Sequence, residues 1–199
     1  MKSYSPFCLC SRRNQIQQST SDFQAHEQQL NFNLSDHNIQ RLQVDGDGNC
    51  LFYALAEGLL REMKKDPYNF GSYLQSFGVS IQSSLVSFAK TLRQICVTQW
   101  KLNEHYYSQF VDMQHISFAK EMKKFSKTGV SDSILGDIVP LTISNIFNVR
   151  ITIFTSLSNM PRIDIKPENS TSSLACRRVI YLAYNQYGAG HYDAAYPRL

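Results

Sequence analysis

The chain has 199 residues, of which 43% are hydrophobic and 18% charged, as expected of one globular domain with a substantial core. Lys and Arg exceed Asp and Glu by only 20 − 16 = 4, and the basic residues are scattered, which argues against a nucleic-acid-binding protein. No apolar run approaches the roughly 20 residues that span a bilayer, so we expect no membrane span.

The five cysteines are an odd number without any paired CxxC spacing. This pattern argues against a disulfide framework and against a structural zinc site. We therefore expect no metal and no cofactor. A reducing compartment fits this cysteine usage best, so we expect a cytoplasmic protein.

The first 35 residues are rich in Gln, Ser, Asn and Asp and contain few large apolar side chains. Such a composition buries too little surface to offset the entropy of ordering the backbone. It predicts a flexible N-terminal extension over residues 1–35, in which the alternating LNFNL of residues 30–34 could add an edge strand. The globular domain then covers residues 36–199.

Helical periodicity begins at Cys50, after which Leu51, Leu55, Leu59 and Met63 recur on one face. Asp66 and Pro67 end this helix. Three more helices are predicted over residues 79–99, over residues 116–127, and from a cap at Ser131 or Asp132 through Phe147, with a kink at Pro140.

The last third of the chain changes to short β-branched and apolar runs. Residues 149–155 and 177–184 predict buried strands, with a shorter strand at residues 162–165. Helices followed by strands indicate an α+β domain with helices packed around one central sheet.

The stretch VDGDGNCLFYALAEGL, residues 44–59, begins like a calcium loop. Counted from Asp45, the ligands Asp47 and Asn49 fit an EF-hand at positions 3 and 5. Position 6 requires glycine and is Cys50, and position 12 requires a carboxylate and is Ala56. The calcium hypothesis fails.

A nucleophile at a helix N-terminus explains the same stretch better. The turn over residues 45–49 can direct several backbone N–H groups into one space, where they would hold an oxyanion. At the start of the helix, Cys50 lies where the helix dipole favours a thiolate. On this stretch alone, an inert buried cysteine is an equally good interpretation.

A thiol nucleophile needs a base, and the C-terminal QYGAGHYDAAYP offers one. If Tyr192 lies in a strand, His191 and Asp193 point to the same face. The carboxylate could then hold the imidazole in the tautomer that presents its other nitrogen to Cys50.

At these residues the chain resembles the OTU (ovarian tumour) cysteine proteases, deubiquitinases of the papain-like superfamily. The nucleophile motif D-G-x-C-L-F reads here as residues 47–52, DGNCLF. The histidine motif, an apolar strand, a short loop and then H-Y-[ND], reads VIYLAYN followed by His191, Tyr192 and Asp193. The resemblance covers about residues 42–196 and implies a papain-like OTU fold for the catalytic domain.

The resemblance implies that Cys50 attacks the isopeptide carbonyl at the C-terminus of ubiquitin and that His191 serves as base and then as acid. Asp193 would orient His191. In some family members, the aspartate that corresponds to Asp47 has been counted as this third catalytic residue instead. Asp47 would otherwise shape the loop whose backbone, including Gly48 and Asn49, forms the oxyanion hole. Tyr192 would wall the channel for the glycines that end ubiquitin.

The implied partners are ubiquitin or polyubiquitin, with a ubiquitin-like modifier as the alternative, and the implied enzyme is a monomer. If the protein is an effector that a bacterium delivers into a host cell, it would act in the host cytosol. Two other functions stay open. One is a papain-like Cys-His-Asp peptidase or transferase with another substrate, and the other is a ubiquitin or ubiquitin-like binding module with weak catalysis.

Overall fold

The computed structural model describes residues 20–112, 117–131, 133–168 and 178–198. Its helices are α1 (Thr20–Asp36), α2 (Cys50–Lys65), α3 (Ser72–Gln75), α4 (Leu85–Leu102), α5 (Glu104–Tyr107), α6 (Phe118–Phe125) and α7 (Val139–Phe147), with short π or 3-10 turns at Pro67–Gly71, Ser108–Phe110 and Ile134–Ile138. Its strands are β1 (Ile39–Leu42), β2 (Arg150–Thr155), β3 (Arg162–Ile165), β4 (Val179–Asn185) and β5 (His191–Pro197).

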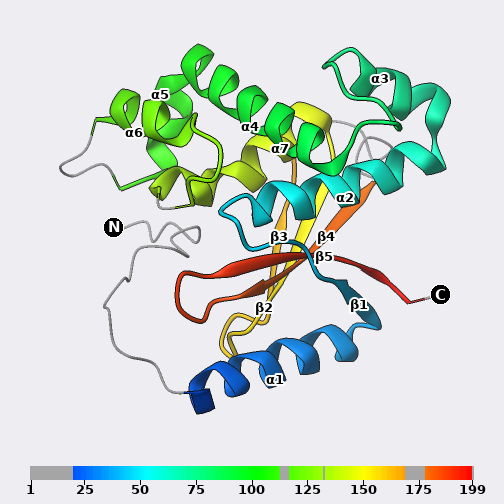
Figure 1. Cartoon of the computed structure of the whole chain (residues 1–199), viewed down its shortest axis with the longest axis vertical. Helices are drawn as coiled ribbons and strands as arrows, with labels where there is room; N and C mark the ends of the chain where they lie inside the picture. The colour runs from blue at the N-terminus through cyan, green and yellow to red at the C-terminus, as the bar shows by residue number, and fades with distance from the viewer. Residues whose placement is uncertain (1–19, 113–116, 132, 169–177, 199) are drawn as a thin grey trace.

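The five strands form one mixed sheet in the order β1-β5-β4-β2-β3 (Figure 1). Strands β2 and β4 run parallel, and the other neighbouring pairs run antiparallel. Strands β4 and β5 form a hairpin in which Asn185 is paired with His191. The hairpin therefore brings His191 to the start of an inner strand, next to the edge strand β1.

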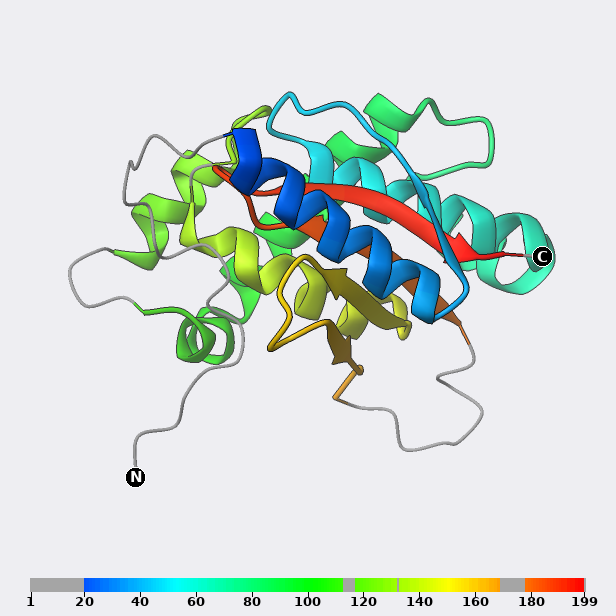
Figure 2. The same cartoon turned by 90° about the horizontal axis from the view of Figure 1, so that it is seen from below.

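Helices cover both faces of the sheet. Helix α2 packs on β5 and β4, with α4 beyond it, and α7 packs on β2 and β3 next to α4. Helix α1 crosses the opposite face (Figures 1 and 2). The main core lies between α2 and the sheet, and a smaller core joins Leu30 and Leu34 of α1 to Phe154 and Ala183 of the sheet. The predicted fold class, an α+β domain with its sheet between helices, is confirmed.

The prediction of a flexible extension is wrong for residues 20–35, which form most of α1. The edge strand at residues 30–34 is wrong for the same reason. Leu30 and Leu34, four residues apart, face the sheet and are fully or nearly fully buried. The Asn33 side chain also donates to the Thr155 carbonyl at 2.8 Å. Two well-placed leucines and this bond outweigh the polar composition, and residues 1–19 lie outside the described part.

Pro140 does not kink the predicted fourth helix but lies in the first turn of α7. A proline is tolerated there because the backbone N–H it lacks would have no helical partner. The preceding Ile134–Ile138 forms a 3-10 turn capped by Ser133 rather than by Ser131, and Asp132 lies outside the described residues. The predicted helix over residues 79–99 begins later, at Leu85, where Ser84 provides the cap.

Among the described residues, no helix is long and apolar enough to cross a membrane.

Candidate active site

The nucleophile loop ends at Cys50, the first residue of α2, whose side chain is partly exposed. Gly48 adopts a left-handed φ of 84°, and a Cβ there would overlap the carbonyl oxygen of Gly129. A Cβ on Gly46 would lie 3.6 Å from Cε1 and Nδ1 of His191. The glycines thus let the loop pass close to both the imidazole and the Gly129 backbone.

Asp47 organises this loop from inside. Its Oδ1 accepts hydrogen bonds from the Asn49 backbone N–H at 3.0 Å and from Asn49 Nδ2 at 3.1 Å, and its Oδ2 accepts one from the Tyr53 hydroxyl at 2.8 Å. Burial acts to raise the pKa of Asp47, but these bonds outweigh it and hold the pKa below the usual range. All three bonds run to the loop or to α2.

A buried guanidinium supports the loop from below. Arg93 of α4 is 1% exposed, and its Nη2 donates to the Gly48 carbonyl at 3.1 Å and to Asn49 Oδ1 at 3.0 Å. Its Nη1 donates to the carbonyls of Phe125 and Val130, both at 3.0 Å. Burial lowers the pKa of Arg93. The nucleophile loop is thereby tied to residues 125–130.

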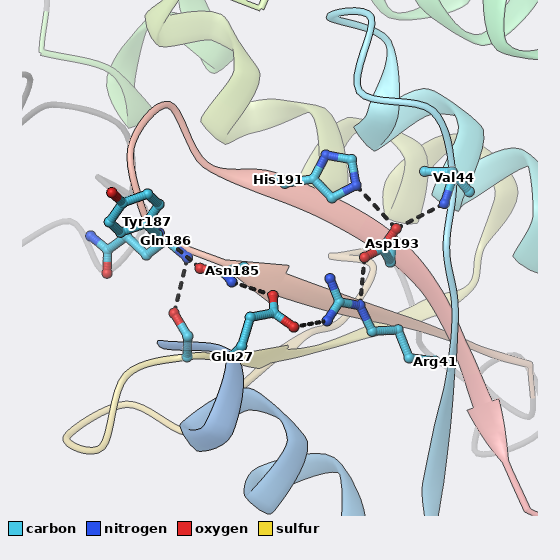
Figure 3. A network of polar contacts seen from close by, with 9 residues as sticks. Glu27, Arg41, Val44, Asn185, Gln186, Tyr187, His191 and Asp193 are labelled. Carbon is cyan, nitrogen blue, oxygen red and sulfur yellow. Dashed lines mark hydrogen bonds and ion pairs between the residues drawn. The ribbon is translucent and has the colours of Figure 1, made fainter. Parts of the chain in front are cut away.

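His191 lies at the first position of β5, and its Nε2 is 3.1 Å from Oδ1 of Asp193 (Figure 3). The side-chain hydrogen bonds with Asp193 and with the Cys50 thiol raise the pKa of His191 to about 10. Because Nε2 faces Asp193, Nδ1 is the ring nitrogen left for Cys50. The histidine therefore carries a positive charge at neutral pH.

Asp193 is only 1% exposed, yet each of its oxygens accepts a strong hydrogen bond. Oδ1 accepts the Val44 backbone N–H at 2.8 Å besides facing His191, and Oδ2 accepts Nε of Arg41 at 2.6 Å (Figure 3). Burial alone would raise the pKa of Asp193, but the bonds from His191, Val44 and Arg41 lower it. Asp193 is thus an oriented, ionised carboxylate.

A narrow cavity of about 50 Å³ opens beside Cys50. The rings of Tyr184 and Tyr192 lie 4.4 Å apart between their centroids, and both residues line the cavity with Gly190. A Cβ on Gly190 would come within 2.5 Å of the Tyr184 hydroxyl. The space suits an extended backbone with small side chains.

The structure brings together Cys50, His191 and Asp193, and it places Gly48 and Tyr192 at the cavity. Asn49 and Asp47 fix the loop through hydrogen bonds. Among the described residues, no three His, Cys, Asp or Glu side chains cluster as a metal site would require.

Sequence reasoning did not identify Arg41 or Arg93. A signal for Arg93 existed, because it shares a buried helix face with Ala89, Cys96 and Trp100. A cation on such a face indicates a buried polar contact. Arg41 gave no local signal, since Asp193 lies 152 positions away.

No protein-family model matches the chain. The chain is 26% identical over 168 residues to OVARIAN TUMOR DOMAIN-containing deubiquitinating enzyme 11 of Arabidopsis thaliana, covering 84% of this chain and 54% of that protein. Enzyme 9 of the same name and organism is 27% identical over 175 residues, with 82% and 40% covered. The chain therefore spans about half the length of these curated relatives.

Solved structures share the fold. The OTU domain of OTUD1 matches with a TM-score of 0.59 at 18% identity, covering 88% of this chain and 97% of that one. A chain of the complex of OTUB1 with ubiquitin aldehyde and UBC13~Ub matches with a TM-score of 0.63 at 17% identity, covering 88% and 83%.

Fold and site together define the class: an α+β domain that brings a helix-borne cysteine to a histidine and a carboxylate on the sheet. Within that class the fold is that of the OTU domains, and both comparisons confirm the resemblance to the OTU family.

Proposed function

We propose that the chain is a cysteine-dependent deubiquitinase that hydrolyses isopeptide bonds at the C-terminus of ubiquitin. The observation that carries the proposal is the contact between His191 and Asp193, 3.1 Å from Nε2 to Oδ1, on an imidazole that also bonds the Cys50 thiol. The relatives' names and the ubiquitin aldehyde in the OTUB1 complexes support ubiquitin as the substrate.

In the first half of the reaction, the Cys50 sulfur attacks the carbonyl carbon of the last residue of ubiquitin. The negative charge that develops on the carbonyl oxygen needs N–H donors. The backbone N–H groups of Gly48 and Cys50 would supply them, because the Asn49 N–H is bound to Asp47. As the C–N bond breaks, protonated His191 gives its proton to the departing lysine amine. A thioester between ubiquitin and Cys50 remains.

In the second half, His191 is neutral and removes a proton from water, which attacks the thioester carbonyl. The C–S bond breaks, the ubiquitin carboxylate leaves, and Cys50 and His191 return to their starting state. Asp193 keeps the ring aligned through both proton transfers, because its carboxylate binds the same ring nitrogen throughout.

The narrow cavity beside Cys50, which Tyr184 and Tyr192 line, supports a substrate that ends in small residues. Ubiquitin, polyubiquitin or a ubiquitin-like modifier with such a tail would suit it. We further propose that the protein acts as a monomer in the cytoplasm, or in the host cytosol if it is a delivered effector.

The test is hydrolysis of ubiquitin and ubiquitin-like proteins that carry a fluorogenic C-terminal amide. We expect the wild type to turn over at least one of these substrates and Cys50→Ala to turn over none. A binding module would instead retain the substrate without cleaving it. A papain-like peptidase of other specificity would cleave short peptides equally well, and a transferase would pass the acyl group to an added amine.

A further inference from the structure

A row of charged side chains runs from α1 to the candidate histidine (Figure 3). Glu27 of α1 binds Arg41 of β1, with Oε2 and Nη1 2.7 Å apart. Arg41 binds Asp193 of β5 through Nε at 2.6 Å, and Asp193 faces His191. The consecutive elements α1 and β1 therefore meet the remote strand β5 in one line of alternating charge.

The position of the Asp193 carboxylate depends on Arg41. The guanidinium is 15% exposed and is the donor to Oδ2, while Val44 and His191 share Oδ1. Without Arg41, Oδ2 would be a buried and unpaired oxygen, and the carboxylate would rotate or shift toward a new donor. Any such rotation also moves Oδ1, which fixes the plane of the imidazole.

Glu27 holds both the arginine and the hairpin. Its Oε2 binds Arg41, and its Oε1 accepts Nδ2 of Asn185 at 2.5 Å. Asn185 is the register partner of His191 across the β4–β5 hairpin, and its Oδ1 accepts the backbone N–H of Tyr187 at 2.9 Å. One carboxylate of α1 thus touches the support of Asp193 and the turn that leads to His191.

A second tether from α1 reaches the same hairpin. Nδ1 of His26 lies 2.9 Å from Oγ of Ser156, and this hydroxyl accepts the backbone N–H of Gln186 at 2.9 Å. Adjacent residues of α1 therefore fix adjacent residues of the hairpin. A helix outside the Cys–His–Asp constellation is built into its support.

The charges also explain why Glu27 is needed as well as Arg41. Arg41 and protonated His191 compete for the same carboxylate, so an unopposed Arg41 would weaken the hold of Asp193 on the imidazolium. Glu27, 24% exposed, neutralises Arg41 from the other side. The ionisable groups that act directly on His191 are Asp193 and Cys50.

We propose that Glu27 and Arg41 are positioning residues, which act through Asp193 to hold His191 in register with Cys50. The inference rests on the proposed function and deepens it, because it makes α1 part of the catalytic unit. Neither side chain lines the cavity beside Cys50, so their effect falls on turnover rather than on binding of the ubiquitin tail.

The test compares Glu27→Gln and Arg41→Lys with matched controls in the full chain. Gln keeps the shape of Glu27 without its charge, and Lys keeps the charge of Arg41 without the fork that reaches two carboxylates. The controls are Asp164→Asn and Arg162→Lys, which make the same two changes in an ion pair of 2.9 Å on β3, at the other edge of the sheet. All four variants are first checked for a cooperative thermal transition.

Two readouts separate the inference from the proposed function. The first is the rate of Cys50 alkylation by iodoacetamide against pH, with peptide mapping, which needs no ubiquitin. The second is turnover of the fluorogenic ubiquitin substrate. We expect Glu27→Gln and Arg41→Lys to lower kcat roughly tenfold to a hundredfold with little change in KM. The high-pH limb of the Glu27→Gln alkylation profile should shift to lower pH, and the controls should match the wild type.

Folded Glu27→Gln with wild-type kcat and an unchanged alkylation profile would overturn the inference. So would a loss explained entirely by a smaller fraction of active molecules, because a structural role alone produces that result. If wild-type Cys50 reacted no faster than the fully buried Cys96, the proposed function would fail first. The Glu27→Gln variant keeps the inference testable if Arg41→Lys does not fold.

Discussion

Two arginines, Arg93 fully buried and Arg41 partly buried, hold the two halves of the candidate site in different ways. On the nucleophile side, the four described hydrogen bonds of Arg93 go to three carbonyls and one amide oxygen, none of them charged. On the histidine side, Arg41 binds two carboxylates. The rings of Phe52 and Phe125 lie 4.6 and 4.7 Å from the Arg93 guanidinium and help to offset its desolvation.

The two sides of the site should therefore respond differently to pH. Uncharged acceptors do not titrate, so Arg93 should keep its hold on the loop before Cys50 over a wide pH range. Asp47 also holds this loop, and because its pKa lies below the usual range it would lose its charge only in acid. The histidine side depends on carboxylates and an imidazole, whose charges change with pH. Loss of a loop contact should therefore appear as lost stability, and loss of a histidine contact should appear as lost turnover and altered pH dependence.

The largest expected effect separates the two aspartates. Asp193→Ala removes the carboxylate that faces His191, and we expect turnover of the ubiquitin substrate to fall about a thousandfold. Asp47→Asn keeps an acceptor for Asn49 but turns an –NH2 donor toward the Tyr53 hydroxyl, so its turnover should fall roughly tenfold. Steady-state kinetics on folded variants decide the point, and the opposite order would assign the orienting role to Asp47.

A smaller but still large effect is expected for Arg93→Lys. Lysine cannot donate to four separate oxygens in the plane of a guanidinium, so buried acceptors of the loop lose their donor. The free energy of unfolding should fall by about 3 kcal/mol, measured by urea denaturation. The matched control is Arg61→Lys, since Arg61 lies 3.9 Å over the Tyr196 ring at the surface and should lose only about 0.5 kcal/mol. Equal losses would refute the role of Arg93.

Gly48→Ala tests the close approach of the loop to Gly129. Both Gly48 and Gly78 have left-handed φ angles, of 84° and 79°, but only at Gly48 would a Cβ meet backbone atoms. We expect Gly48→Ala to lose about 2 kcal/mol and Gly78→Ala about 1 kcal/mol of unfolding free energy. If the two variants were equally stable, the contact between the loop and Gly129 would not constrain the site.

The smallest effect concerns pH. Folding raises the pKa of His191 from 6.5 to about 10, so its stabilising contribution is complete below about pH 6.5 and is lost as pH rises through 10. We expect the wild type to lose about 1 kcal/mol more than His191→Gln between these pH values, with screening by water allowed for. An equal loss of unfolding free energy in the two proteins would show that the charge of His191 does not stabilise the fold.

The parts of the site that depend on short local sequence patterns could be predicted from the sequence. The turn of residues 45–49, the helix at Cys50 and the strand that puts His191 and Asp193 on one face all depend on near neighbours. The roles of Arg41 and Glu27 depend on contacts with Asp193 and Asn185, respectively, which lie more than 150 positions away in the sequence. No local pattern reveals such contacts.

The error at α1 has a similar cause. Its composition is polar, and the decisive contacts come from Leu30, Asn33 and Leu34 against a sheet assembled from the other end of the chain. Burial of two leucines contributes roughly 3 to 6 kcal/mol, enough to order a helix of marginal propensity. Composition averaged over 35 residues does not reveal so few contacts.

The most direct test of the central claim is reaction with ubiquitin that carries a C-terminal propargyl warhead, followed by intact mass and peptide mapping. The account predicts one adduct, on Cys50, that is absent in Cys50→Ala and forms more slowly in His191→Ala. An adduct on Cys96, or equal rates with and without His191, would contradict it. Folded wild-type protein that binds the probe without reacting would contradict it as well.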